Sequence, residues 1–296
     1  MKPLIHATIT DLCSNTNTLY GKIMIVDVGC SSGPNAVALI STAIDSIHSH
    51  CLQINQPPPE VCVLLNDLPD NDFNVVVKSL VTLRQSKKNI VVTGLAPGSF
   101  YERLFTSNSL HLVCSSNSLH WLSKAPEDLT RNHIPAFDID EHARRERLPV
   151  VCEAYAQQFK KDFSLFLELR AKELVSGGRM VISLGVIDKA KYDSFYVPLY
   201  GPSIEELREI IEVEGSFSIR DMRVHDPRTE MTTTLSTPTS FVNNLRALFE
   251  PIIVQHFGKV MDEFAMAAEL YWSLDGSLQE ERARTSRAML AVSLVK

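Results

Sequence analysis

The sequence predicts an α/β fold, in which a mostly parallel β-sheet carries helices on both of its faces. Apolar runs typical of buried strands alternate with stretches of helical periodicity along most of the chain. The first two runs, which begin at Ile23 and at Val61, each lead into polar and acidic residues. Because ligands bind beyond the carboxyl ends of the strands in such sheets, the pattern also predicts a ligand site there.

The first strand leads into a glycine turn within the segment Ile23–Asn35, which reads IMIVDVGCSSGPN. Gly29 and Gly33 let the backbone approach a ligand where a Cβ would collide, and Pro34 suits the first turn of a helix. Apolar residues then recur at helical spacing over Val37–Ile47. A glycine turn after a strand is common in α/β proteins, so a plain packing role stays open.

The second strand, Val61–Leu65, leads into Asp67. An acidic residue at the end of this strand faces the ribose hydroxyls in nucleotide-binding sheets, although a turn aspartate before proline explains it equally well. The glycine turn reads C-S-S where a dinucleotide site needs a glycine against the pyrophosphate. This argues against an NAD- or FAD-dependent oxidoreductase and favours a nucleoside cofactor without phosphates, S-adenosylmethionine.

The remaining elements follow from the same periodicities. Further strands are expected at Ile90–Thr93, His111–Cys114 and Arg179–Leu184, and two late strands at Phe217–Val224 and Ala288–Val295 can pair antiparallel at one sheet edge. Helices are expected at Glu153–Leu174, from a capping box at Ser203 through Val213, and around Phe241–Phe249 and Val260–Leu274. The segment Lys124–Pro149 is expected to be a loop.

Length and composition bound the class of protein. With 296 residues and 45% apolar content, the chain can bury a large core at the upper limit for one domain. A net charge of −6 without a lysine or arginine block gives no support for a nucleic-acid partner. Six cysteines without a C-x-x-C pair, no apolar run of membrane-spanning length and no signal-peptide core predict a cytoplasmic protein with reduced thiols and no membrane partner.

A third polar strand end lies in Leu110–Ser123, where an apolar run reaches serines and then His120 and Trp121. Tryptophan offers a flat apolar wall and one N–H donor, which suits a small aromatic ligand. Taken alone, His120 is more readily explained as a hydrogen-bonded core histidine, which is what a single histidine near an apolar segment usually is. Its place at the carboxyl end of a central strand would bring it toward the glycine turn and Asp67.

These blocks together resemble the plant SABATH methyltransferases, the salicylate, benzoate and theobromine synthase family. The matching blocks, in the family's order, read VDVGCSSGPN, LLNDLPDNDFN, GLAPGSFYERLF, SSNSLHWLS and KELVSGGRMV. The resemblance implies a Rossmann-like, S-adenosylmethionine-dependent fold in a single domain over residues 1–296, usually homodimeric. It also implies a reduced helical cap from about 124–150 and 186–275 over a buried pocket for a small carboxylic acid.

The resemblance further implies the residues of the site. The glycine-turn part of the cofactor site would be Asp27, Cys30 and Asn35, the ribose and adenine contacts Asp67 and Leu68, and the adenine-side contacts Ser99 and Phe100. The substrate positions would be Asn117, His120 and Trp121.

No residue is expected to act as a catalytic acid or base. A carboxylate with a pKa near ~4 is already ionised at neutral pH, so positioning by His120 and Trp121 in a dry pocket is enough. Histidine before Trp121 is similar to the benzoate, salicylate, anthranilate and jasmonate branches. We therefore expect a methyl ester of a small aromatic acid, with jasmonate, indole-acetate or another acid of the family as the alternative.

Three departures from the family bear on activity. Some members bind Mg²⁺, and the matching positions here are Asn132, Asp193, Phe195 and Tyr196, of which the last replaces an asparagine and so weakens a hard-cation site. Family members also carry an earlier N-terminal segment that closes over the ligands, and a longer cap helix before Asp193. A truncated, cofactor-binding relative with little activity is therefore a second interpretation.

Overall fold

The computed structural model describes residues 2–15, 21–32, 37–87, 91–134, 141–185, 200–225, 237–257, 261–275 and 289–296. These residues fall into two compact units, residues 1–224 with 289–296 and residues 225–288. The elements in chain order are α1 (Lys2–Asn15), β1 (Lys22–Val28), α2 (Ala38–Gln53), β2 (Glu60–Asp67), α3 (Phe73–Ser86), β3 (Val91–Pro97), β4 (Leu110–Ser116), α4 (Glu127–Arg131), α5 (Glu141–Glu173), β5 (Leu174–Gly185), α6 (Ile204–Glu214), β6 (Ser218–His225), α7 (Pro238–Phe257), α8 (Met261–Asp275) and β7 (Met289–Val295).

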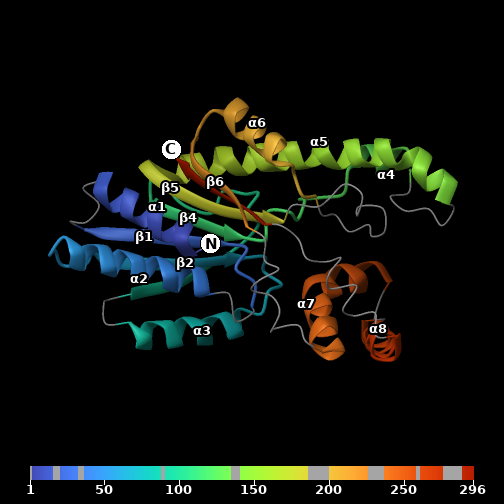
Figure 1. The fold of residues 1–296 in the computed structure, drawn as a ribbon, viewed down its shortest axis with the longest axis horizontal. Helices are drawn as coiled ribbons and strands as arrows, with labels where there is room; N and C mark the ends of the chain where they lie inside the picture. The colour runs from blue at the N-terminus through green and yellow to red at the C-terminus, as the bar shows by residue number, and fades with distance from the viewer. Residues whose placement is uncertain are drawn as a thin grey trace. The chain divides into compact units, whose positions relative to one another are not determined.

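The first unit is built on a seven-stranded sheet with the order β3-β2-β1-β4-β5-β7-β6 (Figure 1). Strand β1 pairs in parallel with β2 on one side and with β4 on the other, so that Asp27 lies beside Leu65 and Cys114. Strand β7 runs antiparallel to β5. The predicted α/β fold with a late antiparallel strand is therefore confirmed. The strand order reverses beside β1, and sheets of this kind bind ligands at the carboxyl ends of the strands that flank such a point.

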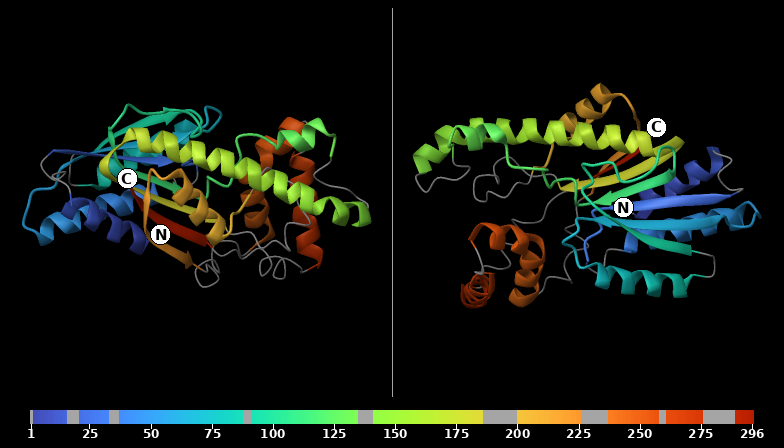
Figure 2. Two further views of the ribbon diagram at one scale, coloured as in Figure 1. Left: turned by 90° about the horizontal axis from the view of Figure 1, so that it is seen from above. Right: turned by 180° about the vertical axis from the view of Figure 1, so that it is seen from behind.

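Helices cover both faces of this sheet (Figure 2). Successive side chains of a strand point to opposite faces, and β1 divides its apolar residues accordingly. Ile23 and Ile25 pack in one core with α1, α2 and α3. Val26 and Val28 pack in the other core with α5 and α6. Burial on both faces explains why the strands read as continuous apolar runs.

Two helix boundaries differ from the prediction. Helix α2 begins at Ala38, whereas Pro34 lies outside the described residues. The loop predicted over 124–149 is wrong, because this stretch contains α4 and the start of α5. Half of the first ten residues of α5 are charged, and most of those whose side chains the structure describes are exposed, so this stretch has no apolar periodicity. Pro149, normally a helix stop, lies inside α5.

Helix α6 begins at the predicted capping box. The Ser203 hydroxyl accepts a hydrogen bond from the Glu206 N–H at 3.1 Å, and the Glu206 carboxylate accepts one from the Ser203 N–H at 2.7 Å. Gly215 ends the helix with a φ of +78°, the left-handed conformation that favours glycine. Residues at the two ends of α6, Ser203 with Glu206 and Gly215, therefore determine where this helix begins and ends.

The described part of the second unit contains α7 and α8. Helix α7 is longer than predicted at both ends, and α8 begins and ends one residue later than predicted. Phe241 and Trp272 pack edge to face, with ring centroids 4.8 Å apart. Arg246 pairs with Glu250 at 3.0 Å and with Asp262 at 2.7 Å, which joins the two helices through charge. Among the helices of the described ranges, none is both long and apolar enough to cross a bilayer.

Candidate functional site

The carboxyl ends of β1, β2 and β3 are tied together by backbone and amide hydrogen bonds. The N–H groups of Gly29 and Cys30 both donate to the carbonyl oxygen of Asn66 at 2.9 Å. The Asn66 side-chain amide donates to the carbonyl oxygen of Gly98 at 2.8 Å, and the Gly98 N–H donates to Asp67 O at 2.9 Å. The predicted glycine turn, the end of the second strand and the start of the PGSFY block therefore lie together. We call this region, with the end of β4, the strand-end site.

The end of β4 joins the same region through Ser118. The Ser118 hydroxyl donates to the carbonyl oxygen of Val28 at 3.0 Å and lies 2.6 Å from the Ser115 hydroxyl. Gly29 has a φ of +74°, and a Cβ built on it would lie 2.5 Å from Ser118 Oγ and closer still to Ser118 Cβ. The close approach of β1 to β4 therefore requires glycine at this turn, for packing as well as for conformation.

Two carboxyl groups lie at the strand-end site. Asp27 is only 3% exposed, and its Oδ1 has no hydrogen-bond partner among the described residues. Asp67 Oδ2 accepts from the Ser31 N–H at 2.6 Å, and Oδ1 accepts from the Leu68 N–H at 2.8 Å. Burial, and secondly the charge of Asp67, raise the pKa of Asp27 well above its usual range. Burial also raises the pKa of Asp67, opposed by its two backbone hydrogen bonds.

Cys30 closes the turn as a neutral, buried side chain. Burial and the two neighbouring aspartates, Asp27 and Asp67, raise the pKa of the Cys30 thiol far above its ordinary value. The thiolate is the nucleophilic form of cysteine, so this thiol is unreactive. Cys30 therefore contributes an apolar surface and a backbone N–H to the site, not chemistry.

The predicted adenine-side residues also lie at the strand-end site. The Phe100 ring packs edge to face on Phe166 of α5, with centroids 6.3 Å apart, and its Cε1 lies 3.5 Å from the position of a Cβ on Gly29. The Ser99 hydroxyl accepts from the Tyr101 N–H at 3.2 Å, which shapes the turn. Leu68 is 53% exposed and so leaves apolar surface open for contact.

The predicted substrate residues occupy the turn after β4. The rings of His120 and Trp121 have centroids 5.6 Å apart. Their backbone is held from outside the turn: the Tyr200 N–H donates to His120 O at 3.1 Å, and the Tyr101 hydroxyl donates to Trp121 O at 2.7 Å. Asn117 is exposed at the head of the turn and has a φ of +55°, an uncommon conformation that asparagine tolerates better than most residues.

Some predicted positions are not brought to this site by the described structure. Asn35, Asp193, Phe195 and Tyr196 lie outside the described residues. Asn132 is exposed just after α4, where its N–H donates to Asp128 O at 3.2 Å. No cluster of three or more histidine, cysteine or acidic residues suited to a metal occurs within the described ranges. The Mg²⁺ assignment therefore stays a prediction.

Sequence reasoning missed four residues that hold the site together. Asn66 and Ser118 join the strand ends, and Arg170 and Glu173 of α5 bind the loop after β3. Asn66 and Ser118 lie next to the predicted residues Asp67 and Asn117, but the partners of their side chains are far away in the sequence. Arg170 and Glu173 lie three residues apart on a helix, a spacing that is typical of ion pairs on an exposed helix surface.

The chain is similar to known proteins along most or all of its length. A family model described as SAM dependent carboxyl methyltransferase matches residues 1–184 and 182–296. A salicylate/benzoate carboxyl methyltransferase of Arabidopsis thaliana is 35% identical over 80% of this chain and 71% of its own length. A probable jasmonic acid carboxyl methyltransferase 2 of Theobroma cacao is 33% identical over 100% of this chain and 91% of its own. A probable caffeine synthase 2 of Camellia sinensis is 35% identical over 88% of this chain and 82% of its own length.

A solved structure shares the fold as well. The structure of a loganic acid methyltransferase with SAH superposes with a TM-score of 0.79 at 27% identity, covering 100% of this chain and 91% of that chain.

Proposed function

Because the chain belongs to the family of S-adenosylmethionine-dependent carboxyl methyltransferases, we propose that it methylates the carboxylate of a small aromatic acid. Benzoate, salicylate and anthranilate are the candidate substrates, and the product is a methyl ester. The observation that carries this proposal is the His120–Trp121 pair in the turn after β4, next to the strand-end site. An indole wall with one N–H donor suits a flat acid.

The residues of the strand-end site fit the cofactor. S-adenosylmethionine supplies an electrophilic methyl group on a sulfonium, and it also carries an ammonium group. The unpartnered Oδ1 of buried Asp27 is an acceptor that a cationic ligand group would satisfy, since a buried carboxylate without a partner is costly. Asp67 would accept the ribose hydroxyls with the lone pairs that its backbone bonds leave free. Gly29 keeps the approach to the turn free of a Cβ.

The remaining assignments follow from positions around the turn. Phe100 would pack on the adenine side together with Leu68, and Ser99 would contact the same part of the cofactor. Asn117, His120 and Trp121 would orient the acid, with the indole N–H holding one carboxylate oxygen. No protein group needs to remove a proton, because the acid is ionised at neutral pH. Rate enhancement then comes from orientation and from exclusion of water.

A methyl-transfer assay tests the proposed substrate class. The purified chain is incubated with methyl-labelled S-adenosylmethionine and, separately, with benzoate, salicylate, anthranilate, jasmonate, indole-acetate, gibberellin and xanthosine. We expect labelled methyl ester from at least one small aromatic acid, and a large loss of turnover in Trp121→Ala. Labelling of only jasmonate, gibberellin or xanthosine would reject the aromatic class. Binding of S-adenosylhomocysteine without any labelled product would favour a silent relative.

The quaternary and cap assignments belong to the same proposal. We expect a homodimer, and a cap formed by residues from about 124–150 and 186–275. Light scattering on the eluting protein would give the mass of the assembly. Activity with and without a chelator would show whether Mg²⁺ at Asn132 and its proposed partners has any role.

A further inference from the structure

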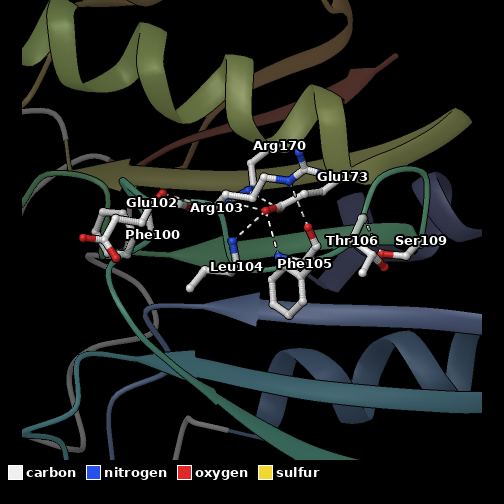
Figure 3. Close-up of polar contacts among 9 residues, drawn as sticks. All are labelled: Phe100, Glu102, Arg103, Leu104, Phe105, Thr106, Ser109, Arg170 and Glu173. Carbon is white, nitrogen blue, oxygen red and sulfur yellow. Dashed lines mark hydrogen bonds and ion pairs between the residues drawn. The ribbon is translucent and has the colours of Figure 1, made fainter.

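The connection between β3 and β4, residues 98–109, is an irregular loop, with no helix between these two parallel strands. Its backbone groups therefore cannot pair as those of a helix or strand do, and a buried N–H or carbonyl group that is left without a partner is costly. Helix α5 supplies those partners through two side chains near its end, Arg170 and Glu173 (Figure 3).

Glu173 supplies the acceptors. Its Oε1 accepts hydrogen bonds from the Leu104 N–H at 2.8 Å and from the Phe105 N–H at 2.9 Å. Its backbone carbonyl oxygen accepts from the Ser109 N–H at 2.8 Å, which caps the end of α5 with the same loop. One residue thus binds both the middle and the end of the connection.

Arg170 supplies the donors. Its Nη1 donates to the carbonyl oxygen of Phe100 at 3.0 Å, and its Nη2 donates to that of Glu102 at 2.9 Å. The planar guanidinium presents its N–H groups in a fixed fork, so the two carbonyls are held in one relative geometry. The guanidinium carbon also lies 5.3 Å from the centroid of the Phe166 ring, on which Phe100 packs.

The two side chains are fully buried and paired with each other. Arg170 Nε lies 2.7 Å from Glu173 Oε2, and both side chains are 0% exposed. Removing such charges from water carries a large penalty, and apolar residues of similar volume are often as stabilising. Here apolar replacements would leave two carbonyl and two N–H groups of the loop without partners. The pair is therefore suited to shaping the loop between Phe100 and Phe105.

We propose that Arg170 and Glu173 are positioning residues for the cofactor site. They hold residues 98–105 so that Ser99 and Phe100 lie beside the turn at Gly29. This inference rests on the proposed assignment of Ser99 and Phe100 to the cofactor. Neither charged side chain touches the cofactor in this assignment, so their effect on binding acts through the loop.

Substitution of Arg170 tests the inference against a matched control. Arg170→Met removes the fork while keeping an unbranched apolar stem. Arg179→Met removes another buried arginine of the same unit, which is 3% exposed and pairs with Asp11 of α1 at 2.8 Å. We expect both to lower the melting temperature. Only Arg170→Met should raise the Kd of S-adenosylhomocysteine in calorimetry, on the order of tenfold or more, because small misplacements of ligand-contacting groups have large effects.

Amide hydrogen exchange provides the second readout. In Arg170→Met the N–H groups of Leu104 and Phe105 should exchange faster, and Arg179→Met should leave them protected. An equal rise of Kd in both variants, or an unchanged Kd with faster exchange in the loop, overturns the positioning role.

A conservative variant keeps the inference testable if Arg170→Met fails to fold. Glu173→Gln retains an oxygen that accepts from Leu104 and Phe105 but loses the charge opposite Arg170. The Kd of S-adenosylhomocysteine should rise less in Glu173→Gln than in Glu173→Met, and an equal rise in these two variants would contradict the role of the backbone contacts.

The titrations with S-adenosylhomocysteine contain no carboxylic acid substrate. Their result therefore does not depend on whether the methyl-transfer assay supports an aromatic acid as the substrate. Phe100→Ala tests the cofactor assignment separately. An unchanged Kd in that variant rejects the assignment of Phe100 itself.

Discussion

Asp162 of α5 accepts two hydrogen bonds from Ser123, one from the backbone N–H at 2.8 Å and one from the hydroxyl at 2.7 Å. Gln158, one turn earlier on the helix, donates to the same carboxylate at 2.9 Å. Ser123 ends the turn that carries His120 and Trp121. Helix α5 therefore binds the predicted substrate turn through Asp162 and the predicted cofactor loop through Arg170, two helical turns further on.

Asp162→Asn is expected to impair use of the acid without weakening cofactor binding. The amide leaves one oxygen where the carboxylate offered two, so one of the two bonds from Ser123 is lost. A hydrogen bond to a charged group contributes about 1.5–3 kcal/mol, so we expect kcat/KM for the acid to fall about tenfold or more. Steady-state kinetics with the acid and calorimetry with S-adenosylhomocysteine measure the two effects separately.

The matched control for this prediction is Glu168→Gln. Glu168 is another acid of α5, but it pairs with Lys172 on the exposed side of the helix, where both side chains are more than half exposed. Exposed pairs of this kind contribute little. Equal losses of acid turnover and cofactor affinity in Asp162→Asn would reject a role specific to the substrate turn.

The sequence predicted the parts of the site that are encoded locally. Strand β1 and the turn at Gly29 were recognisable from an apolar run followed by a residue type with few alternatives. Asp67 was recognisable because its place at the end of β2 follows from the strand itself. The structure confirms that these segments meet, through the bonds from Gly29 and Gly98 to β2.

The parts that were not predicted depend on contacts between distant segments. Asp162, Arg170 and Glu173 are charged residues in a helix, and local pattern places such residues on a solvated face. Their burial follows from the irregular loops after β3 and β4, whose backbone groups need partners. The start of α5 was missed for a simpler reason, since a charged, exposed helical segment has no apolar period.

Gly29→Ala is expected to destabilise the protein and to abolish measurable cofactor binding. A left-handed conformation costs a residue with a Cβ about 1–2 kcal/mol, and overpacking against Ser118 adds about 1–3 kcal/mol. Urea unfolding gives the change in the free energy of unfolding. The double variant Gly29→Ala, Ser118→Gly should recover part of the loss, because it removes the overlap but leaves the conformational strain.

Gly21→Ala is the control for the glycine prediction. Gly21 precedes β1, and no heavy atom lies within 4 Å of a Cβ built there. Its substitution should leave stability and binding nearly unchanged. If Gly29→Ala is tolerated as well as Gly21→Ala, the close approach of β1 to β4 does not constrain the turn.

Asp27→Asn is expected to stabilise the ligand-free protein while weakening cofactor binding. Burial and the charge of Asp67 raise the pKa of Asp27 in the folded protein. Above pH 3.8 the unfolded chain therefore releases the proton of Asp27 more readily than the folded chain does. Stability therefore falls as pH rises from the unfolded value near 3.8 toward the folded pKa, by at most about 1.4 kcal/mol per pH unit. Asparagine removes this dependence.

Urea unfolding at pH 5 and pH 8 measures the effect of Asp27→Asn on stability, and calorimetry with S-adenosylhomocysteine measures its effect on cofactor binding. The gain in stability of Asp27→Asn should be larger at pH 8. The Kd should rise, because the amide cannot compensate a cationic group as a carboxylate does. A variant that is less stable than the original protein at pH 8 would show that the buried carboxylate is satisfied in the fold.

His111 is expected to make the stability of the protein sensitive to mild acid. The Met24 N–H of β1 donates to His111 Nδ1 at 3.1 Å, and this contact requires a neutral ring with its proton on Nε2. Burial and then the charge of Lys22 lower the pKa of His111 from 6.5. Below pH 6.5 the unfolded chain binds a proton on His111 more readily than the folded chain does, so stability falls as pH drops toward the folded pKa.

His111→Asn keeps an acceptor near the position of Nδ1 and cannot titrate. Its free energy of unfolding should therefore change less than that of the original protein between pH 7.5 and 5.5. His142→Asn is the control, because it removes an exposed histidine of α5 without changing the contact between β4 and β1. If His111→Asn loses as much stability on acidification as the original protein, protonation of His111 is not what weakens the contact between β4 and β1.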